Sequence, residues 1–229
     1  MPHLKKTPPN AEALRKARCD YARKQVVKIF VNSNVKDHTD VYPRFEISEL
    51  GMGKVLGKGG FGVVNEIRSL KIVHDKRGKK KGDNEVDDVE EQAREFIAEH
   101  CIRDGGDARY AVKYLREEVI KNPAMFILAI KDLAIESRFL SSIKHPNIVK
   151  MRALSTVDPC NENFFIIMDR LYDTLEKRIE KWRKRHKAAF SVVGRVTDRK
   201  GLKVLALLEE RVVAAYDISS AFEYLHSHK

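Results

Sequence analysis

The sequence predicts an α+β protein in which a small sheet is accompanied and then followed by helices. Two β-like runs flank a cluster of glycines within residues 45–70. Apolar residues recur at three- and four-residue steps over residues 123–143, which is the period of an α-helix. A long amphipathic run predicts another helix over residues 202–229. Three shorter apolar runs predict further strands, at residues 108–115, 145–156 and 163–171.

The composition is that of a folded and strongly basic protein. Hydrophobic residues make up 43% of the 229 residues, enough for a sizeable core, and charged residues make up 34%. Lys and Arg total 44 against 33 Asp and Glu, which gives a formal net charge of +11. This balance favours anionic partners such as nucleotides, nucleic acid, acidic lipids or phosphoproteins, although a solvated basic surface explains it equally well.

The cysteines and the apolar runs indicate in which cellular compartment the protein is expected. Cys19, Cys101 and Cys160 form no CxxC pair and have no metal-ligand spacing, which favours a reducing intracellular compartment, cytoplasmic or nuclear. No apolar run approaches the ~18 residues that a membrane span needs, so we expect no span. The N-terminus lacks the apolar core of a secretion signal, and two acidic residues count against a transit peptide at residues 11–25.

Two segments outside the regular elements are rich in charge. Residues 1–44 form a basic N-terminal extension, with a helix predicted over residues 11–30 and a loop after it. Residues 71–107 form a charged insertion, of which residues 74–84 are predicted as a loop and residues 88–102 as a short helix. That helix would carry its apolar side chains on one side, namely Val89, Ala93, Phe96 and Ile97.

The last part of the chain predicts two helices with a loop between them. Residues 172–187 have a helical pattern with a strongly basic end, and residues 191–201 are predicted as loop. The basic run at residues 181–201 suits an acidic partner, with a solvated face as the alternative, and it lacks the interleaved aromatics expected for nucleic acid. In the final helix we expect an exposed apolar stripe, made of Leu205, Leu208, Val212, Ile218, Phe222 and Leu225.

Four glycines stand in the run LGKGGFGVV. Gly57, Gly59 and Gly62 form a GxGxxG pattern, which in a dinucleotide-binding fold would open a helix. Val63 and Val64 follow instead and favour a strand, and the GK[ST] of a Walker loop is not present. The run therefore predicts a strand–turn–strand hairpin. It is either an ordinary hairpin or one whose backbone N–H groups approach phosphates because no Cβ blocks them.

The pattern extended to Val64 is that of the protein-kinase glycine loop, and four later segments follow in kinase order. They are AVK ending at Lys113, IESRFLSSIKHPNIVKM with Glu136, FFIIMDRL, and AAYDISSAFEYLHSHK. From residue 45 onward the chain resembles the eukaryotic protein kinases, and the HPNIV turn and last helix favour the serine/threonine class. The resemblance implies a small lobe at residues 45–171, with an antiparallel sheet and one glutamate-bearing helix. Helices of an incomplete large lobe would follow at residues 172–229.

The resemblance implies ATP as the cofactor, with Mg²⁺, and a protein as the substrate. Lys113 and Glu136 are the candidate catalytic residues. Lys113 would place its ammonium against the α- and β-phosphates, and Glu136 would supply the counter-charge, with Asp132 as the competing partner. Because Glu136 shares a helix face with Leu140 and Ile143, packing of that face on the sheet would aim it at Lys113.

The other candidate residues are implied as parts of an ATP site. Phe61 would cap the phosphates, and Leu56, Val64 and Ala111 would lie above the adenine. Met168 would line the back of the adenine slot, and the backbone of Asp169 and Leu171 would meet the adenine edge. The implied ATP-binding set is Leu56, Gly57, Lys58, Gly59, Gly60, Phe61, Gly62, Val64, Ala111, Lys113, Met168, Asp169 and Leu171.

Three segments that complete a kinase are not found in the 229 residues, which contain no HRD, DFG or APE. The resemblance puts the catalytic base and the Mg²⁺ ligands in those segments, so no metal ligand is assigned here. We therefore expect these residues alone not to transfer the γ-phosphate to serine or threonine hydroxyls. Three interpretations stay open: the ATP-binding part of an active kinase, a catalytically dead module that binds ATP or a regulatory partner, and a basic nucleic-acid-binding protein.

Overall fold

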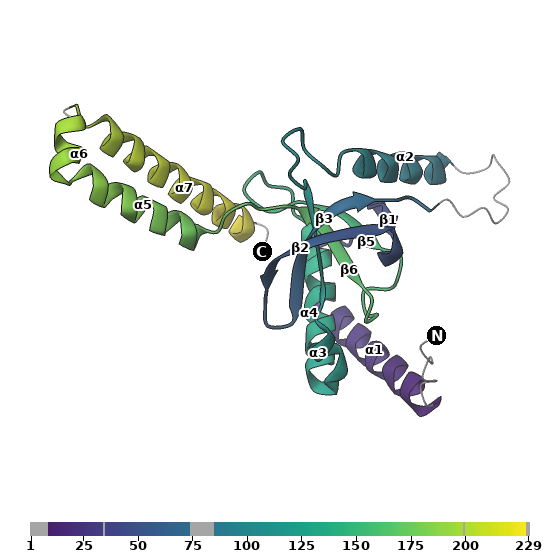
Figure 1. The fold of residues 1–229 in the computed structure, drawn as a ribbon. Coiled ribbons are helices and arrows are strands. Elements are labelled where there is room, and N and C mark those ends of the chain that lie inside the picture. Colours follow the sequence, from purple (N-terminus) through teal and green to yellow (C-terminus); the bar gives the residue numbers. More distant parts are fainter. Residues whose placement is uncertain (1–8, 34, 74–84, 199, 228–229) are drawn as a thin grey trace. The chain divides into compact units, whose positions relative to one another are not determined.

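The computed structural model describes residues 9–33, 35–73, 85–198 and 200–227, and it has an α+β fold (Figure 1). The chain divides into two compact units. The first contains the residues up to 144 together with residues 149–170, and the second contains residues 145–148 and the residues from 171 onward. The first unit holds the sheet, and the second is helical.

Six strands form one mixed sheet in the order β1-β5-β6-β4-β3-β2. Their bounds are β1 (Arg44–Phe45), β2 (Leu50–Lys58), β3 (Gly62–Leu70), β4 (Tyr110–Leu115), β5 (Met151–Ser155) and β6 (Phe165–Asp169). All neighbouring pairs are antiparallel except β1 and β5, which are parallel. The prediction of a purely antiparallel sheet is therefore wrong at this edge. There the backbone of residues 43–45 runs along β5 and bonds to the N–H groups of Leu154 and Thr156.

The helices of the first unit include the predicted N-terminal helix, α1 (Pro9–Phe30), and the predicted helix α4 (Pro123–Ser142). Two more helices are α2 (Glu85–Glu99) and the short α3 (Glu117–Lys121), and single 3₁₀ turns cover Thr39–Val41 and Ile47–Glu49. The start of α4 is well specified. The Asn122 side chain accepts hydrogen bonds from the N–H groups of Ala124 and Met125, and Pro123 occupies the first helical position.

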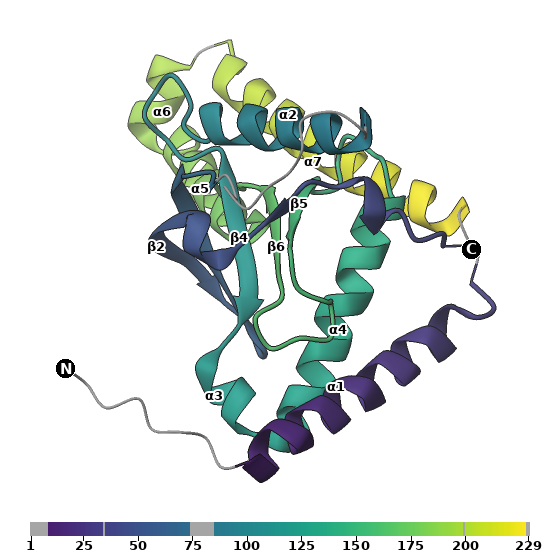
Figure 2. The same cartoon turned by 90° about the vertical axis from the view of Figure 1, so that its right-hand side faces the viewer.

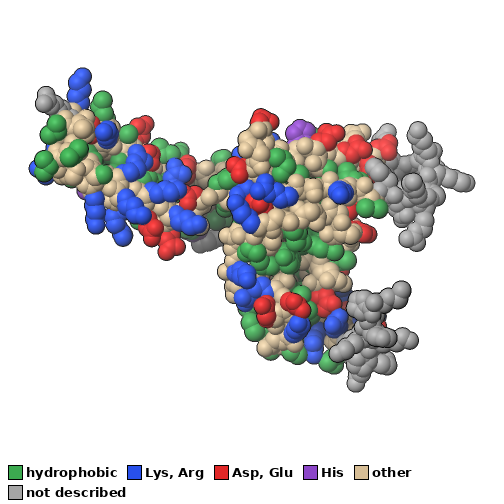
Figure 3. Space-filling view, in the orientation of Figure 1, with side chains coloured by type: hydrophobic (Ala, Val, Ile, Leu, Met, Phe, Trp, Pro, Cys, Tyr) green, Lys and Arg blue, Asp and Glu red, His purple; other side chains and the backbone are tan. Residues whose placement is uncertain are grey.

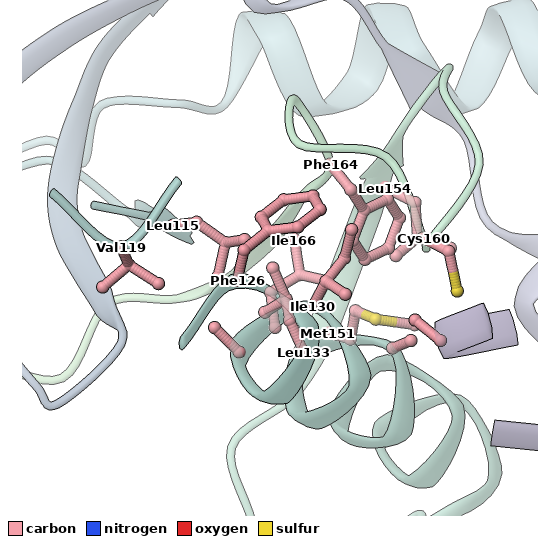
Figure 4. Packing of buried hydrophobic residues seen from close by; sticks show 13 residues of the cluster. Leu115, Val119, Phe126, Ile130, Leu133, Met151, Leu154, Cys160, Phe164 and Ile166 are labelled. Atoms are coloured by element: carbon pink, nitrogen blue, oxygen red, sulfur yellow. The ribbon is translucent and has the colours of Figure 1, made fainter. Parts of the chain in front are cut away.

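The middle of the sheet is buried on both faces, as β6 shows. Ile166 and Ile167 are neighbours on β6 and are both fully buried, although successive strand residues point to opposite faces. Ile166 belongs to a cluster with α1 and α4, part of which Figure 4 shows, and Ile167 belongs to a second cluster that includes Ile97 of α2. The charged insertion thus contributes a helix that covers the sheet face away from α4.

The predicted apolar side of the insertion's helix is only partly buried, since Ala93 is half-buried while two of its four members are exposed. Ile97 is buried, whereas the side chains of Val89 and Phe96 are 65% and 58% exposed. Arg94 lies on the buried side and pairs with Glu49 at 2.5 Å. A prediction made from the apolar residues of the helix alone does not include this charged side chain. The predicted basic loop at residues 74–84 lies outside the described residues.

Glu49 connects α2 to the sheet, and its loss is expected to loosen that helix. This carboxylate is 2% exposed and also accepts the N–H groups of Glu46 at 2.8 Å and Val73 at 2.9 Å. Glu49→Gln removes the buried charge partner of Arg94 and leaves the guanidinium with Glu91 at 3.2 Å, so we expect a loss of about 1–3 kcal/mol in the free energy of unfolding. Hydrogen exchange should show the first losses of protection in α2. The exposed Glu95→Gln serves as the matched control, and equal protection in the two variants would contradict the prediction.

The second unit contains α5 (Leu175–Ala189), α6 (Val192–Thr197) and α7 (Leu202–Ser227). The indole N–H of Trp182 donates to Glu210 at 3.0 Å, and this contact joins α5 to α7. The loop predicted at residues 191–201 is wrong over α6. The Ser191 hydroxyl caps this single turn and a half of helix by accepting the Gly194 N–H at 3.1 Å.

Basic and apolar side chains are interspersed on the surface of the second unit (Figure 3). The predicted apolar stripe on α7 is confirmed, since its six side chains are between 39% and 60% exposed. Lys184 and Lys187 of α5 are exposed, while Arg185 pairs with Glu210 at 2.7 Å. An acidic partner for this surface stays a prediction. In the described part of the chain, no helix combines the length and apolarity that crossing a membrane requires.

Candidate functional site

Lys113 and Glu136 form an ion pair between the sheet and α4. Lys113 lies on β4 opposite Val64 of β3, and its Nζ donates a hydrogen bond to Oε2 of Glu136. The two side chains are 29% and 34% exposed, so the pair is open to solvent on one side. Asp132 lies one turn earlier on α4 and is exposed. The structure therefore brings Lys113 to Glu136, the partner expected from the helix face.

The glycine run forms the turn of the β2–β3 hairpin beside this ion pair. The Gly59 N–H donates to the Gly62 carbonyl at 2.9 Å, which closes the turn. A Cβ atom on Gly57 or Gly60 would meet no heavy atom within 4 Å, so open space lies over the backbone there. At Gly62 a Cβ would come within 3.1 Å of the Tyr114 carbonyl oxygen, so this position also favours glycine for packing. The hairpin thus has the exposed main chain that a phosphate cradle requires.

The hairpin and the ion pair line one cavity of about 510 Å³. Apart from the glycine run, three charged side chains reach it, namely Lys113, Asp132 and Glu136. Backbone N–H groups and an ammonium attract a polyanion such as a triphosphate, and Glu136 holds the ammonium in place. The residues present fit the phosphate part of ATP on these grounds.

Phe61 and Arg116 give the hairpin its conformation. Phe61 was expected to cap the phosphates, but its ring packs against the cluster beneath the hairpin and lines the cavity. Arg116 was not anticipated: its N–H donates to the Phe61 carbonyl at 3.0 Å, and its guanidinium donates to the Gly60 carbonyl. The position of Arg116 directly after β4 could have indicated this contact. Leu115 pairs with Gly62, so the next residue of the chain lies beside the turn of the hairpin.

Of the residues assigned to adenine, Val64 lines this cavity, whereas Leu56, Ala111, Met168, Asp169 and Leu171 are not among its lining residues. Ala111 is 2% exposed on β4 and lies opposite Met168 of β6, and Leu56 is half-buried on β2. Asp169 makes a bidentate pair with Arg152, with both N–O distances 2.8 Å. The Asp169 N–H donates to the Lys150 carbonyl at 2.9 Å, so this N–H is not available to an adenine edge.

Two further residues of the implied ATP-binding set, Lys58 and Leu171, are exposed. Lys58 is exposed at the end of β2 and lines the cavity. Leu171 is the first residue of the second unit after the sheet, and its side chain is 69% exposed.

Over the described ranges, no group of three or more His, Cys, Asp or Glu side chains is arranged to hold a metal ion. Comparison with models of known protein families and with curated proteins finds no match for this chain.

Proposed function

We propose that this chain is the ATP-binding portion of a protein kinase that transfers the γ-phosphate of ATP to serine or threonine hydroxyls of proteins. The observation that carries the proposal is the Lys113–Glu136 ion pair beside an open glycine hairpin. An ammonium held by a carboxylate and facing a row of exposed glycines suits the α- and β-phosphates. When bound, ATP supplies the phosphoryl group, and these residues bind and orient its phosphates.

A catalytically dead module that binds ATP or a regulatory partner is the second candidate. It uses the same hairpin and the same ion pair, so ATP binding alone does not separate the two. No HRD or DFG triplet occurs in the 229 residues, and we expect no phosphoryl transfer from them by themselves. Transfer of ³²P to a protein substrate above the level of a Lys113→Met variant would contradict that expectation.

Lys113→Met is expected to weaken the binding of Mg-ATP by at least about tenfold, because it removes the ammonium that faces the phosphates. Isothermal titration of the wild type and the variant measures the change. Lys121→Met is the matched control, since Lys121 also pairs with a glutamate of the first unit but is 71% exposed and away from the cavity. Glu136→Gln should weaken binding in the same direction. Equal affinities for Lys113→Met and Lys121→Met would remove the ATP site from the proposal.

A further inference from the structure

The helix that carries Glu136 is in contact with α1, which lies beside it (Figure 2). Ala22 of α1 is completely buried in the cluster that contains Phe126 and Ile130 of α4. Cys19 and Val26 pack against the same cluster. Their spacing of three and four residues places all three on one face of α1, which makes this face the contact surface with α4.

The end of α1 contacts α4 directly after Glu136. Phe30 is 4% exposed, and its ring centroid lies 5.6 Å from that of Phe139. The guanidinium of Arg138 lies 4.1 Å from the centroid of the Phe30 ring, within the range of a cation–π contact. Arg138 and Phe139 follow Glu136 by two and three positions, so these contacts hold the turn of α4 that aims the carboxylate.

The segment after α1 extends the same contact to the last turn of α4. The His38 N–H donates to the Ser141 hydroxyl at 3.3 Å, and the Ser142 hydroxyl donates to the Lys36 carbonyl. The carboxylate of Asp37 lies 3.9 Å from the Arg138 guanidinium. Several of these bonds use backbone groups of the N-terminal segment and so depend on its path rather than on its side chains.

α1 is also tied to the sheet, through the connection between β5 and β6. Arg15 pairs with Glu162 at 2.8 Å, and Arg23 pairs with Asp158 at 3.1 Å. Cys160 of this connection is 4% exposed and belongs to the cluster that contains Ala22. One helix therefore contacts both α4, which carries Glu136, and the β5–β6 connection of the sheet to which Lys113 belongs.

We propose that residues 9–33 and 35–41 are a positioning element for the Lys113–Glu136 pair, which sets the affinity for ATP by keeping α4 in place on the sheet. These residues precede the part of the chain that resembles a kinase. If α4 moves when α1 leaves, only a fraction of the molecules presents Glu136 to Lys113, and the apparent affinity falls by that fraction. This inference rests on the proposed function for its ATP readout but not for its structural one.

The test replaces Ala22, the buried contact residue of α1, and measures two properties: the affinity for Mg-ATP and the alkylation rate of Cys160. Ala22→Glu inserts a charge into the cluster, and Ala17→Glu makes the same change on the same helix at an exposed position. We expect Ala22→Glu to weaken Mg-ATP binding at least fivefold and Ala17→Glu to leave it unchanged. In a Glu136→Gln background, Ala22→Glu should add less than twofold, because the positioned carboxylate is already gone.

Alkylation of Cys160, followed by peptide mass spectrometry, reports without ATP whether α1 has left. Faster alkylation in Ala22→Glu with wild-type ATP affinity would overturn the proposal, and so would an equal loss of affinity in both backgrounds. Unchanged alkylation and unchanged affinity would overturn it as well. If Ala22→Glu does not fold, Phe30→Leu replaces it in the same cycle, since it keeps apolar bulk but removes the ring contacts. If the wild type itself fails to bind ATP, the proposed function falls, while hydrogen exchange of α4 in Ala22→Glu still tests the positioning element.

Discussion

Glu66→Ala is expected to lower the free energy of unfolding of the sheet unit by about 3 kcal/mol, because it removes a buried carboxylate that lies nearer to the buried guanidinium of Arg170 than Asp107 does at 3.6 Å. Glu66 is 1% exposed, and its Oε1 accepts from Arg68 Nε at 2.7 Å. Its Oε2 lies 3.1 Å from the guanidinium of Arg170, which is itself 7% exposed. Denaturant titration of the full chain measures the loss. Glu117→Ala is the control: it breaks a comparable ion pair at a side chain that is 79% exposed, and it should leave stability within error of the wild type.

The contribution of Glu66 has a definite pH dependence. Burial alone would raise its pKa, but the hydrogen bond and charge of Arg68, with help from Arg170, outweigh burial and hold the pKa below its ordinary value of 4.5. Because the folded-state pKa is depressed, the stabilisation is present above pH 4.5 and is lost as the pH falls below it. The stability difference between wild type and Glu66→Ala should therefore narrow below pH 4.5. A difference that grows toward acid pH would contradict this account.

Much of the sheet unit follows from local patterns in the sequence. The glycine run with Val63 and Val64 after it predicted a hairpin, and β2 and β3 form one. The apolar period over residues 123–143 predicted α4, and the face shared by Glu136 and Leu140 correctly singled out Glu136 over Asp132 as the partner of Lys113. These features depend on short-range periodicity and on the pairing of adjacent strands, which a sequence displays directly.

The features that were missed depend on contacts between distant segments. Arg94 is largely covered because it pairs with Glu49, which lies 45 residues away, so an apolar count on α2 does not identify the whole of its inner side. The two-residue strand β1 is defined by its parallel pairing with β5, which lies more than 100 residues later in the chain. The complete burial of Ala22 cannot be predicted from the sequence, because alanine is common on both the buried and the exposed faces of helices. The N-terminal segment was consequently expected to be an extension, whereas in the structure it packs on α4.

Cys160 is expected to react with an alkylating reagent at least about 100-fold more slowly at pH 8 than an ordinary exposed thiol. Burial, and then the charge of Asp158, raise the pKa of this thiol from 9.0 to about 11, which lowers the thiolate fraction about 100-fold at pH 8. Asp158 stands close because its carboxylate accepts the Cys160 N–H at 2.8 Å. Peptide mass spectrometry after timed alkylation separates Cys160 from the less buried Cys19, which should react first.

The variant Asp158→Asn tests the electrostatic cause of the raised pKa of Cys160 separately from burial. Asp158→Asn keeps a side-chain oxygen for the Cys160 N–H but removes the negative charge, and it leaves Arg23 without that carboxylate. Both changes lower the pKa of Cys160, so alkylation should accelerate while unfolding in denaturant stays close to that of the wild type. Ala22→Glu should accelerate it by the other route, through exposure. An Asp158→Asn variant as slow as the wild type would mean that burial beneath α1 alone protects the thiol, and Cys160 would then be a pure reporter of whether α1 is in place.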